Sequence, residues 1–171
     1  MSACTNHQKC QQSALEQAEK ICAERGSRLT DQRKLVLSLI WESHRPSKAY
    51  DLLEMMQQHD PSAKPPTVYR ALDFLMEQGL IHRIDSLNAF TGCNHPNAHR
   101  DCYFLICKAC GTADECCSPT LTDAIVSAAN LSNFSPGQTT LEIAGTCGLC
   151  TSKNKNPADK HTDNRQLNAP D

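Results

Sequence analysis

The sequence predicts an α+β protein made of an N-terminal winged helix-turn-helix domain and a small C-terminal α/β domain with a four-cysteine zinc site. Two observations predict this architecture. Up to Gly79 the apolar residues recur with the helical period of 3.6, whereas the next dozen residues alternate as in strands. Two Cys-x-x-Cys pairs, Cys107/Cys110 and Cys147/Cys150, each follow a predicted strand in the second half.

Three helices are predicted before residue 60. The first begins at Ser13, which has the spacing of a capping box with Glu16, and ends at Gly26. The second begins after the N-cap Thr30, and the third begins after the N-cap Ser47. Each helix carries an apolar stripe for the core, formed in turn by Leu15, Ala18, Ile21 and Cys22, by Leu35, Val36, Leu39 and Ile40, and by Leu52, Leu53 and Met56.

A fourth helix is predicted to have Pro65-Pro66 in its first turn, to continue over residues 67–78 and to stop at Gly79. Its apolar stripe consists of Val68, Leu72 and Leu75. A hairpin follows, with strands at residues 80–84 and 89–91 around a turn at residues 85–88. Helices followed by a hairpin predict a winged helix in which the fourth helix reads DNA.

The face of this fourth helix opposite its apolar stripe carries candidate DNA contacts. Arg70 can contact guanine with two hydrogen bonds, and Thr67 can bind a phosphate together with free backbone amides. Lys64 can hold the DNA backbone electrostatically, Tyr50 is expected on the exposed side of the third helix, and Ala71 is expected to point away from the core. Singly, such residues are usually solvated surface, but together in this motif they favour DNA binding.

The second half predicts a small β-α-β unit. Residues 103–106 form a buried strand that leads into the first cysteine pair, and residues 139–144 form a strand that leads into the second. Between them a helix begins at Ser118-Pro119, with Leu121, Ile125 and Ala128 directed inward. So few residues make a marginal core, and we therefore expect a bound metal to contribute much of its stability.

The two cysteine pairs are predicted to bind one structural zinc ion. Two sulfurs separated by two residues can hold one ion, and two such pairs complete a tetrahedral set of four soft ligands, which favours zinc. Disulfides are the alternative. Residues 1–19 contain no apolar segment that would direct export, so thiols in a reducing cytoplasm are expected to meet metals rather than each other.

A second group of metal-binding residues lies near the junction of the two domains. Its members are His82, Cys93, His99 and Glu115, with His95 as a competitor of His99. In the predicted hairpin His82 faces Thr91, and Cys93 is its diagonal neighbour on the same face, so both side chains can reach one ion. A mixed site that spans two domains can fix the angle between them, which predicts a regulatory role.

Composition sets further limits on function. The 171 residues include 11 cysteines and carry a formal net charge of −2, yet residues 20–48 hold seven basic and three acidic side chains, which predicts a basic patch. No apolar run approaches membrane-spanning length, and no membrane partner is expected. The chain has neither a His-Glu-x-x-His helix nor a nucleophile with a partner base, which argues against a zinc hydrolase and a small-molecule substrate.

The sequence divides into four expected segments. They are a flexible arm at 1–12, a winged-helix domain at 13–91, a dimerisation and metal-binding domain at 92–151 and a disordered tail at 152–171.

Several runs of sequence are shared with a known superfamily. They are Lys64-Pro-Pro-Thr-Val-Tyr-Arg-Ala-Leu-Asp-Phe-Leu, Ser47-Lys-Ala-Tyr-Asp-Leu-Leu, Ala18-Glu-Lys-Ile-Cys-Ala-Glu-Arg, Arg28-Leu-Thr-Asp-Gln-Arg and the two Cys-x-x-Cys pairs. Together they resemble the ferric uptake regulator (Fur) superfamily, and most closely its zinc-sensing branch, the zinc uptake regulators. The resemblance covers the chain from about residue 13 to residue 150.

The resemblance implies a homodimeric, zinc-activated repressor with a winged-helix domain, a dimerisation domain and two zinc ions per subunit. By position it matches Cys107, Cys110, Cys147 and Cys150 to the structural site, His82, Cys93, His99 and Glu115 to the regulatory site, and Tyr50 and Arg70 to the base contacts, with Tyr69 and Lys64 in the same run. Such proteins bind AT-rich inverted repeats in operator DNA and repress zinc-uptake genes in the cytoplasm.

Some residues depart from the pattern or stay unassigned. Iron- and peroxide-sensing relatives usually have a histidine-rich run before the first cysteine pair, whereas residues 99–102 contain only His99. The thiolate at Cys93 favours zinc over ferrous iron, although a sensor of another divalent metal and a thiol redox switch are alternatives. Cys22 is expected in the core. Three further cysteines, Cys102, Cys116 and Cys117, have no assigned role, and Cys4, His7 and Cys10 are either incidental or a weak auxiliary metal site.

Overall fold

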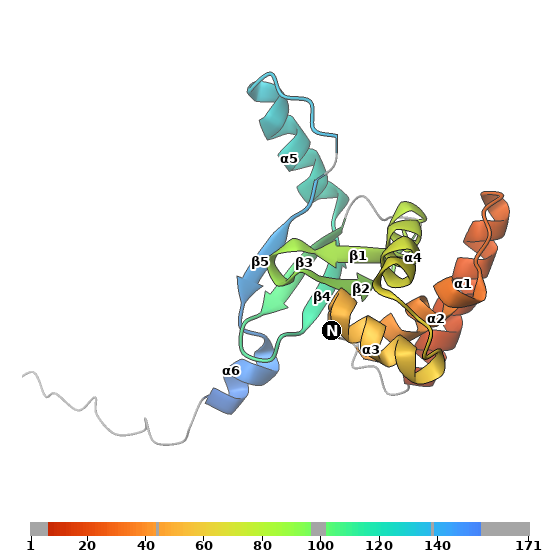
Figure 1. Ribbon diagram of the computed structural model, residues 1–171. Helices are drawn as coiled ribbons and strands as arrows, with labels where there is room; N and C mark the ends of the chain where they lie inside the picture. The colour runs from red at the N-terminus through yellow and green to blue at the C-terminus, as the bar shows by residue number, and fades with distance from the viewer. Residues whose placement is uncertain (1–6, 44, 97–101, 138, 155–171) are drawn as a thin grey trace, which may run out of the picture.

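The computed structural model describes residues 7–43, 45–96, 102–137 and 139–154 and has the predicted α+β architecture (Figure 1). Its elements are α1 (His7–Glu24), α2 (Asp31–Ile40), α3 (Ala49–His59), α4 (Pro65–Glu77), β1 (Ile81–Ile84), the 3-10 turn η1 (Asp85–Leu87), β2 (Ala89–Gly92), β3 (Cys102–Cys107), β4 (Ala113–Cys117), α5 (Pro119–Leu131), β5 (Glu142–Gly145) and α6 (Gly148–Asn154). Four helices therefore precede a hairpin, and a second, smaller sheet follows it.

The four N-terminal helices share one apolar core. The predicted stripes supply most of it, and the largest fully buried side chains are Leu37, Leu39, Ile40, Leu52, Met56, Leu72, Leu75 and Ile81. Cys22 is buried in this core, as expected. Ala71 is also buried, so the expectation that it points away from the core is wrong. The core stripe of α4 is one residue wider than predicted, because Ala71 follows Val68 by three positions and lies on the same face.

Two helix starts differ from the prediction. The first helix begins at His7, so the second half of the predicted flexible arm is helical, and Ser13 lies inside the helix rather than at its cap. The amide of Gln11 explains this extension, because its Nε2 donates to the backbone oxygen of Ser38 at 2.9 Å and to the hydroxyl of Ser38 at 2.7 Å. The third helix begins at Ala49, because Ser47 exchanges two backbone hydrogen bonds of 2.8 Å with Phe90 of the hairpin.

The hairpin β1–β2 is the wing, and its register is the one predicted, with His82 opposite Thr91. Gly79, with φ of 66°, ends the preceding helix, and Asn88, with φ of 46°, closes the turn. Both lie in the left-handed region, which glycine and asparagine adopt more readily than other residues. The last residue of β2, Gly92, packs against the indole of Trp41, and a Cβ there would overlap the ring. This close approach fixes the path of the chain immediately before Cys93.

The C-terminal sheet has the strand order β4-β3-β5. Strands β3 and β5 are parallel and are joined through α5, which confirms the predicted β-α-β unit. The antiparallel partner β4 was not predicted, because its sequence Ala-Asp-Glu-Cys-Cys lacks an apolar alternation.

The C-terminal helices differ from the prediction. Helix α5 contains no buried residue, and Ala128 is exposed rather than directed inward. Helix α6 was not predicted and continues to Asn154, so the expected tail is helical at its start, and residues 155–171 lie outside the described part.

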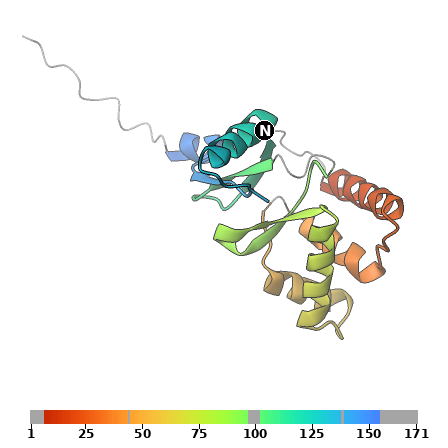
Figure 2. The same cartoon turned by 90° about the horizontal axis from the view of Figure 1, so that it is seen from above.

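The wing packs against the C-terminal sheet as well as the helices, and Figures 1 and 2 show it between the two domains. A second apolar cluster joins Ile84 of the wing to Phe104, Ile106 and Ala113 of the sheet. At the tip of the wing, the carboxylate of Glu142 accepts the backbone N–H groups of Asp85 at 2.6 Å and Ser86 at 3.1 Å. The wing is therefore a shared element, and any group that it carries toward the sheet can link the domains.

Candidate metal centres and nucleic-acid interface

The four cysteines of the two Cys-x-x-Cys pairs come together at one end of the C-terminal sheet. Cys107 ends β3 and Cys110 follows it in the turn to β4, while Cys147 follows β5 and Cys150 lies in α6. Their Sγ atoms all lie within 4.8 Å of one another, and the Sγ atoms of Cys110 and Cys147 are 3.8 Å apart. A tetrahedron with zinc–sulfur bonds of about 2.3 Å has edges of about 3.8 Å, so this donor set fits a zinc ion.

Neighbouring groups shift the pKa values of these thiols in different directions. The backbone N–H of Cys147 donates to the Sγ of Cys107 at 3.3 Å, and with the N–H groups of the Cys107–Cys110 turn it lowers the pKa of Cys107 to about 6. The hydroxyl of Thr112, 3.2 Å from the Sγ of Cys110, lowers the pKa of that thiol. Close contact with Cys147 and Cys110 raises the pKa of Cys150 to about 12. Backbone N–H groups thus stabilise a thiolate at Cys107, and a cation among the four sulfurs would favour the thiolate of Cys150 as well.

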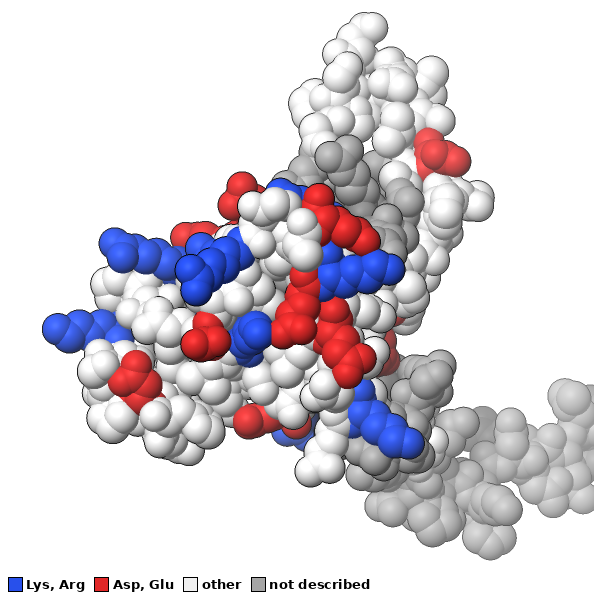
Figure 3. All heavy atoms as spheres, turned by 90° about the vertical axis from the view of Figure 1, so that its right-hand side faces the viewer, with Lys and Arg blue, Asp and Glu red and all other residues white. Residues whose placement is uncertain are grey.

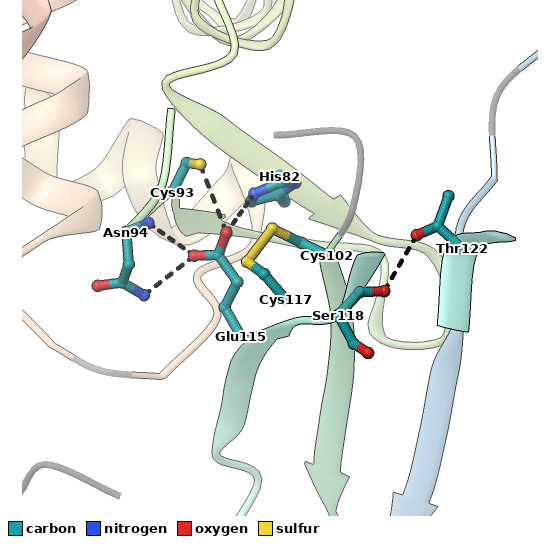
Figure 4. The surroundings of a disulfide bond; sticks show 8 residues. All are labelled: His82, Cys93, Asn94, Cys102, Glu115, Cys117, Ser118 and Thr122. Carbon is teal, nitrogen blue, oxygen red and sulfur yellow. Dashed lines mark hydrogen bonds and ion pairs between the residues drawn. A yellow bond between two sulfur atoms is a disulfide. The ribbon is translucent and has the colours of Figure 1, made fainter. Parts of the chain in front are cut away.

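A second donor set lies where the wing meets the sheet. The Nε2 of His82 on β1 is 3.0 Å from the Oε1 of Glu115 on β4, and the Sγ of Cys93 is 3.5 Å from the same oxygen (Figure 4). Tetrahedral zinc bonds of about 2.0 Å to nitrogen and oxygen and about 2.3 Å to sulfur give separations of about 3.3 Å and 3.5 Å for these pairs. The three side chains therefore fit one zinc ion without large movement.

The surroundings hold the Glu115 carboxylate in place and charged. Its Oε2 accepts the backbone N–H of Asn94 at 2.6 Å and the side-chain amide of Asn94 at 3.0 Å. Burial acts to raise the pKa of Glu115, but the hydrogen bonds from His82 and Asn94 outweigh it, so the pKa lies below its ordinary value. The sequence does not indicate a role for Asn94, because its contact with Glu115 joins residues 21 positions apart.

Cys93 and His82 are both buried, in contrast to the partly exposed tetrathiolate. Burial, reinforced by the negative charge of Glu115, raises the pKa of the Cys93 thiol far above its ordinary value. The ring of His82 packs edge-on against Phe104 with centroids 5.0 Å apart, which orients the imidazole toward Glu115. A divalent cation placed among these groups would remove the cost of ionising Cys93, because its charge compensates both the thiolate and the carboxylate.

The structure brings together three of the four residues predicted for the second site. His82, Cys93 and Glu115 form one group of potential ligands. His99 lies outside the described residues, so its place as the fourth ligand stays a prediction. His95, its competitor, is grouped instead with Glu115 and Cys117, whose donor atoms also lie within 4.8 Å of one another.

Beside this group lies a disulfide that the sequence did not predict. Cys102 and Cys117 are directly opposite each other on β3 and β4 and are bonded through sulfur (Figure 4). The expectation that thiols here meet metals rather than each other is therefore wrong for this pair. It could not be foreseen because β4, which brings Cys117 opposite Cys102, carries no strand signal in the sequence.

The candidate DNA contacts lie on the outer faces of α3 and α4. Tyr50 on α3 is 69% exposed and Tyr69 on α4 is 55% exposed, which is unusual for large aromatic side chains with apolar rings. Arg70 and Lys64 are also exposed, whereas Thr67 is half-buried in the first turn of α4. Because the opposite face of α4 packs into the core, these side chains are free to enter a groove.

The predicted basic patch is less uniform than the sequence suggests, because several of its cations contact neighbouring groups. Lys34 pairs with Glu19 at 2.6 Å, Arg33 lies 3.5 Å above the ring of Phe74, and Arg25 donates to the backbone oxygen of Gln78 at 2.7 Å. Figure 3 accordingly shows Lys and Arg interspersed with Asp and Glu over the helical domain. No helix in the described part of the chain is long and apolar enough to cross a membrane.

Comparisons with known proteins agree with this geometry. The sequence is 42% identical over 141 residues to the zinc uptake regulation protein of Escherichia coli (strain K12), with 81% of this chain and 82% of the relative covered. A solved zinc uptake regulator complexed with zinc and DNA superimposes with a TM-score of 0.80 at 40% identity, covering 84% of this chain and 96% of that one. The crystal structure of holo XcZur gives a TM-score of 0.77 at 41% identity, with coverage of 82% and 98%.

The family assignment rests on most of the chain. The profile described as the ferric uptake regulator family matches residues 24–144, which span α2 to β5 and therefore both domains. The match includes the exposed face of α4, the wing and the whole of the second donor set. This chain belongs to the ferric uptake regulator family.

Proposed function

We propose that this protein is a zinc-responsive transcriptional repressor. In this proposal the zinc-loaded homodimer binds AT-rich inverted-repeat operators in the cytoplasm and represses zinc-uptake genes. The observation that carries it is the donor set made of His82, Cys93 and Glu115, because its members come from the wing and from the sheet of the other domain. The zinc and DNA named in the solved relative support the same conclusion. Such a protein acts by binding rather than by catalysis.

Each subunit is proposed to hold two zinc ions with different roles. Cys107, Cys110, Cys147 and Cys150 form the structural site, because four thiolates saturate a tetrahedral ion and tie the ends of β3 and β5 together. The second site contains only one sulfur among its three described ligands and lies between domains. Ligands of mixed type at a domain junction suit an ion that is exchanged rather than permanently held.

Zinc at the second site supplies a positive charge that neutralises the Cys93 thiolate and the Glu115 carboxylate. With both groups charged, the ion joins His82 and Cys93 at the base of the wing to Glu115 on β4. The wing is continuous with α4 through Gly79, so its position determines where Tyr69 and Arg70 lie. The two reading helices of a dimer can then enter successive major grooves without further ordering, which lowers the free-energy cost of binding DNA.

The dimer is proposed to form through the C-terminal domain. Large apolar side chains are exposed there, namely Leu131, Phe134, Ile143 and Leu149. Among the described strands, β5 pairs only with β3 and leaves an open edge. Helix α5 carries a single charged residue, Asp123, and projects away from the sheet in Figure 1. A face that is apolar and nearly uncharged is typical of a surface that a second copy covers.

A first test measures the link between the second site and DNA. We expect Cys93→Ser to keep one tightly held zinc ion per subunit and to lose the second. Zinc should then no longer increase its affinity for operator DNA, a loss of about 5- to 150-fold for a coupling of about 1–3 kcal/mol. Metal analysis paired with a gel shift checks this result. Cys116→Ser, which changes a neighbouring thiol outside both donor sets, should behave like wild type. Operator binding of Cys93→Ser at full strength would contradict the proposal.

A second test separates base reading from backbone contact. Arg70→Ala should cost about 1–3 kcal/mol on the specific operator and leave binding to random DNA almost unchanged. Lys64→Ala should weaken binding to all duplexes alike. It should also reduce the slope of log affinity against log salt concentration by about one. Fluorescence anisotropy at several salt concentrations measures both. If Arg70→Ala weakened specific and random DNA equally, Arg70 would not read bases.

A third test concerns the tetrathiolate. Cys147→Ser should lose the zinc ion that survives mild chelation and should unfold the C-terminal sheet, because its apolar core consists of few residues. Zinc analysis and the near-ultraviolet circular dichroism of the aromatic residues Tyr103 and Phe104 report the two effects. Full retention of both zinc and the folded sheet would exclude Cys147 from the structural site.

A fourth test uses pH. Burial and Glu115 keep the Cys93 thiol protonated in the absence of a cation, so binding zinc at the second site must release that proton. Zinc affinity at this site should therefore rise by about tenfold or more per pH unit between about pH 6 and pH 8. Competition with a chromophoric chelator measures the slope. If the zinc affinity of the second site did not change with pH, the metal would not displace a proton from Cys93.

A further inference from the structure

One row of side chains crosses the C-terminal sheet and faces the wing. The strand register places Phe104 on β3 opposite Glu115 on β4 and also opposite Glu142 on β5. Residues directly opposite each other in a sheet project from the same face, so these three side chains form the row. The wing covers this face, because Phe104 packs against the ring of His82 and Glu142 accepts the backbone N–H of Asp85. Both ends of the row are therefore carboxylates that contact the wing.

The two carboxylates contact different parts of the wing through different partners. Glu115 contacts the base, where the Nε2 of His82 lies 3.0 Å from its Oε1. Glu142 contacts the tip, where its carboxylate accepts the backbone N–H groups of Asp85 at 2.6 Å and Ser86 at 3.1 Å. Neighbouring strands lie about 4.8 Å apart, so β4 and β5 are separated by about 10 Å across β3. The contact at the tip uses backbone N–H groups as donors and therefore needs no metal ion.

The charges at the wing tip favour the contact with Glu142. Asp85 and Ser86 begin the turn η1, and the first N–H groups of such a turn have no acceptor within it. The carboxylate of Asp85 would repel that of Glu142, but the Nε of Arg83 lies 3.1 Å from the Asp85 carboxylate and offsets its charge. Arg83 also donates to the side-chain oxygen of Asn88 at 3.3 Å, which holds the guanidinium at the tip. The tip thus presents two donors with little opposing charge.

We propose that Glu142 is a positioning residue that holds the wing on the C-terminal sheet without metal and thereby sets the zinc concentration at which the second site fills. The closed arrangement of wing and sheet brings His82 and Cys93 to Glu115. The apparent zinc affinity equals the intrinsic affinity multiplied by the closed fraction, so a contact that favours closure strengthens zinc binding. The inference rests on the proposed function only in placing an exchangeable zinc ion at Glu115.

A variant of Glu142 loses a negative charge as well as two hydrogen bonds, and the two effects need separate controls. Asp114 precedes Glu115 on β4 and is opposite Leu105, so its exposed side chain projects from the other face of the sheet. Asp114→Ala therefore removes a carboxylate near the second donor set without touching the wing. Glu142→Gln removes the charge but keeps an amide oxygen that can accept one N–H group.

The test compares wild type, Glu142→Ala, Glu142→Gln and Asp114→Ala as full-length proteins that already carry zinc at the tetrathiolate. Competition with a chromophoric chelator measures the zinc affinity of the second site. The methyl resonance of Ala113 reports closure, because this side chain is buried in the cluster that joins Ile84 of the wing to the sheet. Size-exclusion chromatography and thermal unfolding verify that the oligomeric state and the fold are the same in all four proteins.

Glu142→Ala should bind the second zinc ion about 3- to 10-fold more weakly than Asp114→Ala, because two hydrogen bonds that favour closure are lost. Before this zinc is added, its Ala113 resonance should lie farther from the zinc-loaded position than that of wild type. Saturating zinc should restore the wild-type position, and Glu142→Gln should be intermediate in both measurements. Equal zinc affinity in Glu142→Ala and Asp114→Ala would overturn the inference, as would an Ala113 resonance that zinc does not restore.

This outcome is distinct from a failure of the proposed function. If the second zinc ion binds but does not increase affinity for operator DNA, the regulatory role is wrong, yet the zinc affinities and the Ala113 resonance still decide whether Glu142 holds the wing. If zinc controls DNA binding and Glu142→Ala fills with zinc as readily as Asp114→Ala, the proposed function stands and the positioning role of Glu142 is excluded.

Discussion

The arrangement of the two domains depends on the carboxylate of Glu115. It lies on the sheet of one domain and accepts hydrogen bonds from His82 of the wing and from Asn94 after it, at distances between 2.6 and 3.0 Å. A buried carboxylate is costly unless it is fully paired, so the chain supplies partners from both sides. The same oxygen lies 3.5 Å from the thiol of Cys93. A metal ion bound there would compete with these hydrogen bonds for one group, and the proposed response to zinc depends on that competition.

The two candidate metal centres differ in how their thiols are prepared. At the four-cysteine cluster the thiols are shifted in both directions, because the N–H of Cys147 lowers the pKa of Cys107 whereas the neighbouring thiols raise that of Cys150. At the domain junction, burial and Glu115 raise the pKa of Cys93, and that thiol must give up its proton to bind. Four sulfur ligands saturate a tetrahedral ion, which suits permanent occupancy. A site that must exchange a proton for an ion suits a sensor, because its affinity is lower and can be adjusted.

Sequence patterns predicted helices α1 to α5, the wing and the cysteine cluster because each has a local signature. The period of 3.6 places the core of α2 to α4, and hairpin geometry places His82 opposite Thr91. The misses share a different cause. Strand β4 is polar and is held in place by pairing with β3, while α1 begins early because Gln11 reaches Ser38, 27 residues away. Contacts between residues distant in sequence leave no periodic trace, so neither Asn94 nor the Cys102–Cys117 pair could be assigned.

Strand β4 has no strand signal in the sequence, yet it positions both Glu115 and one half of the disulfide. Side chains alternate along a strand, so Glu115 and Cys117 share one face and Cys116 points to the other. Pairing with β3 then places Cys102 opposite Cys117. The pairing with β3 that positions Glu115 toward the wing thus also places the Cys102–Cys117 disulfide beside it.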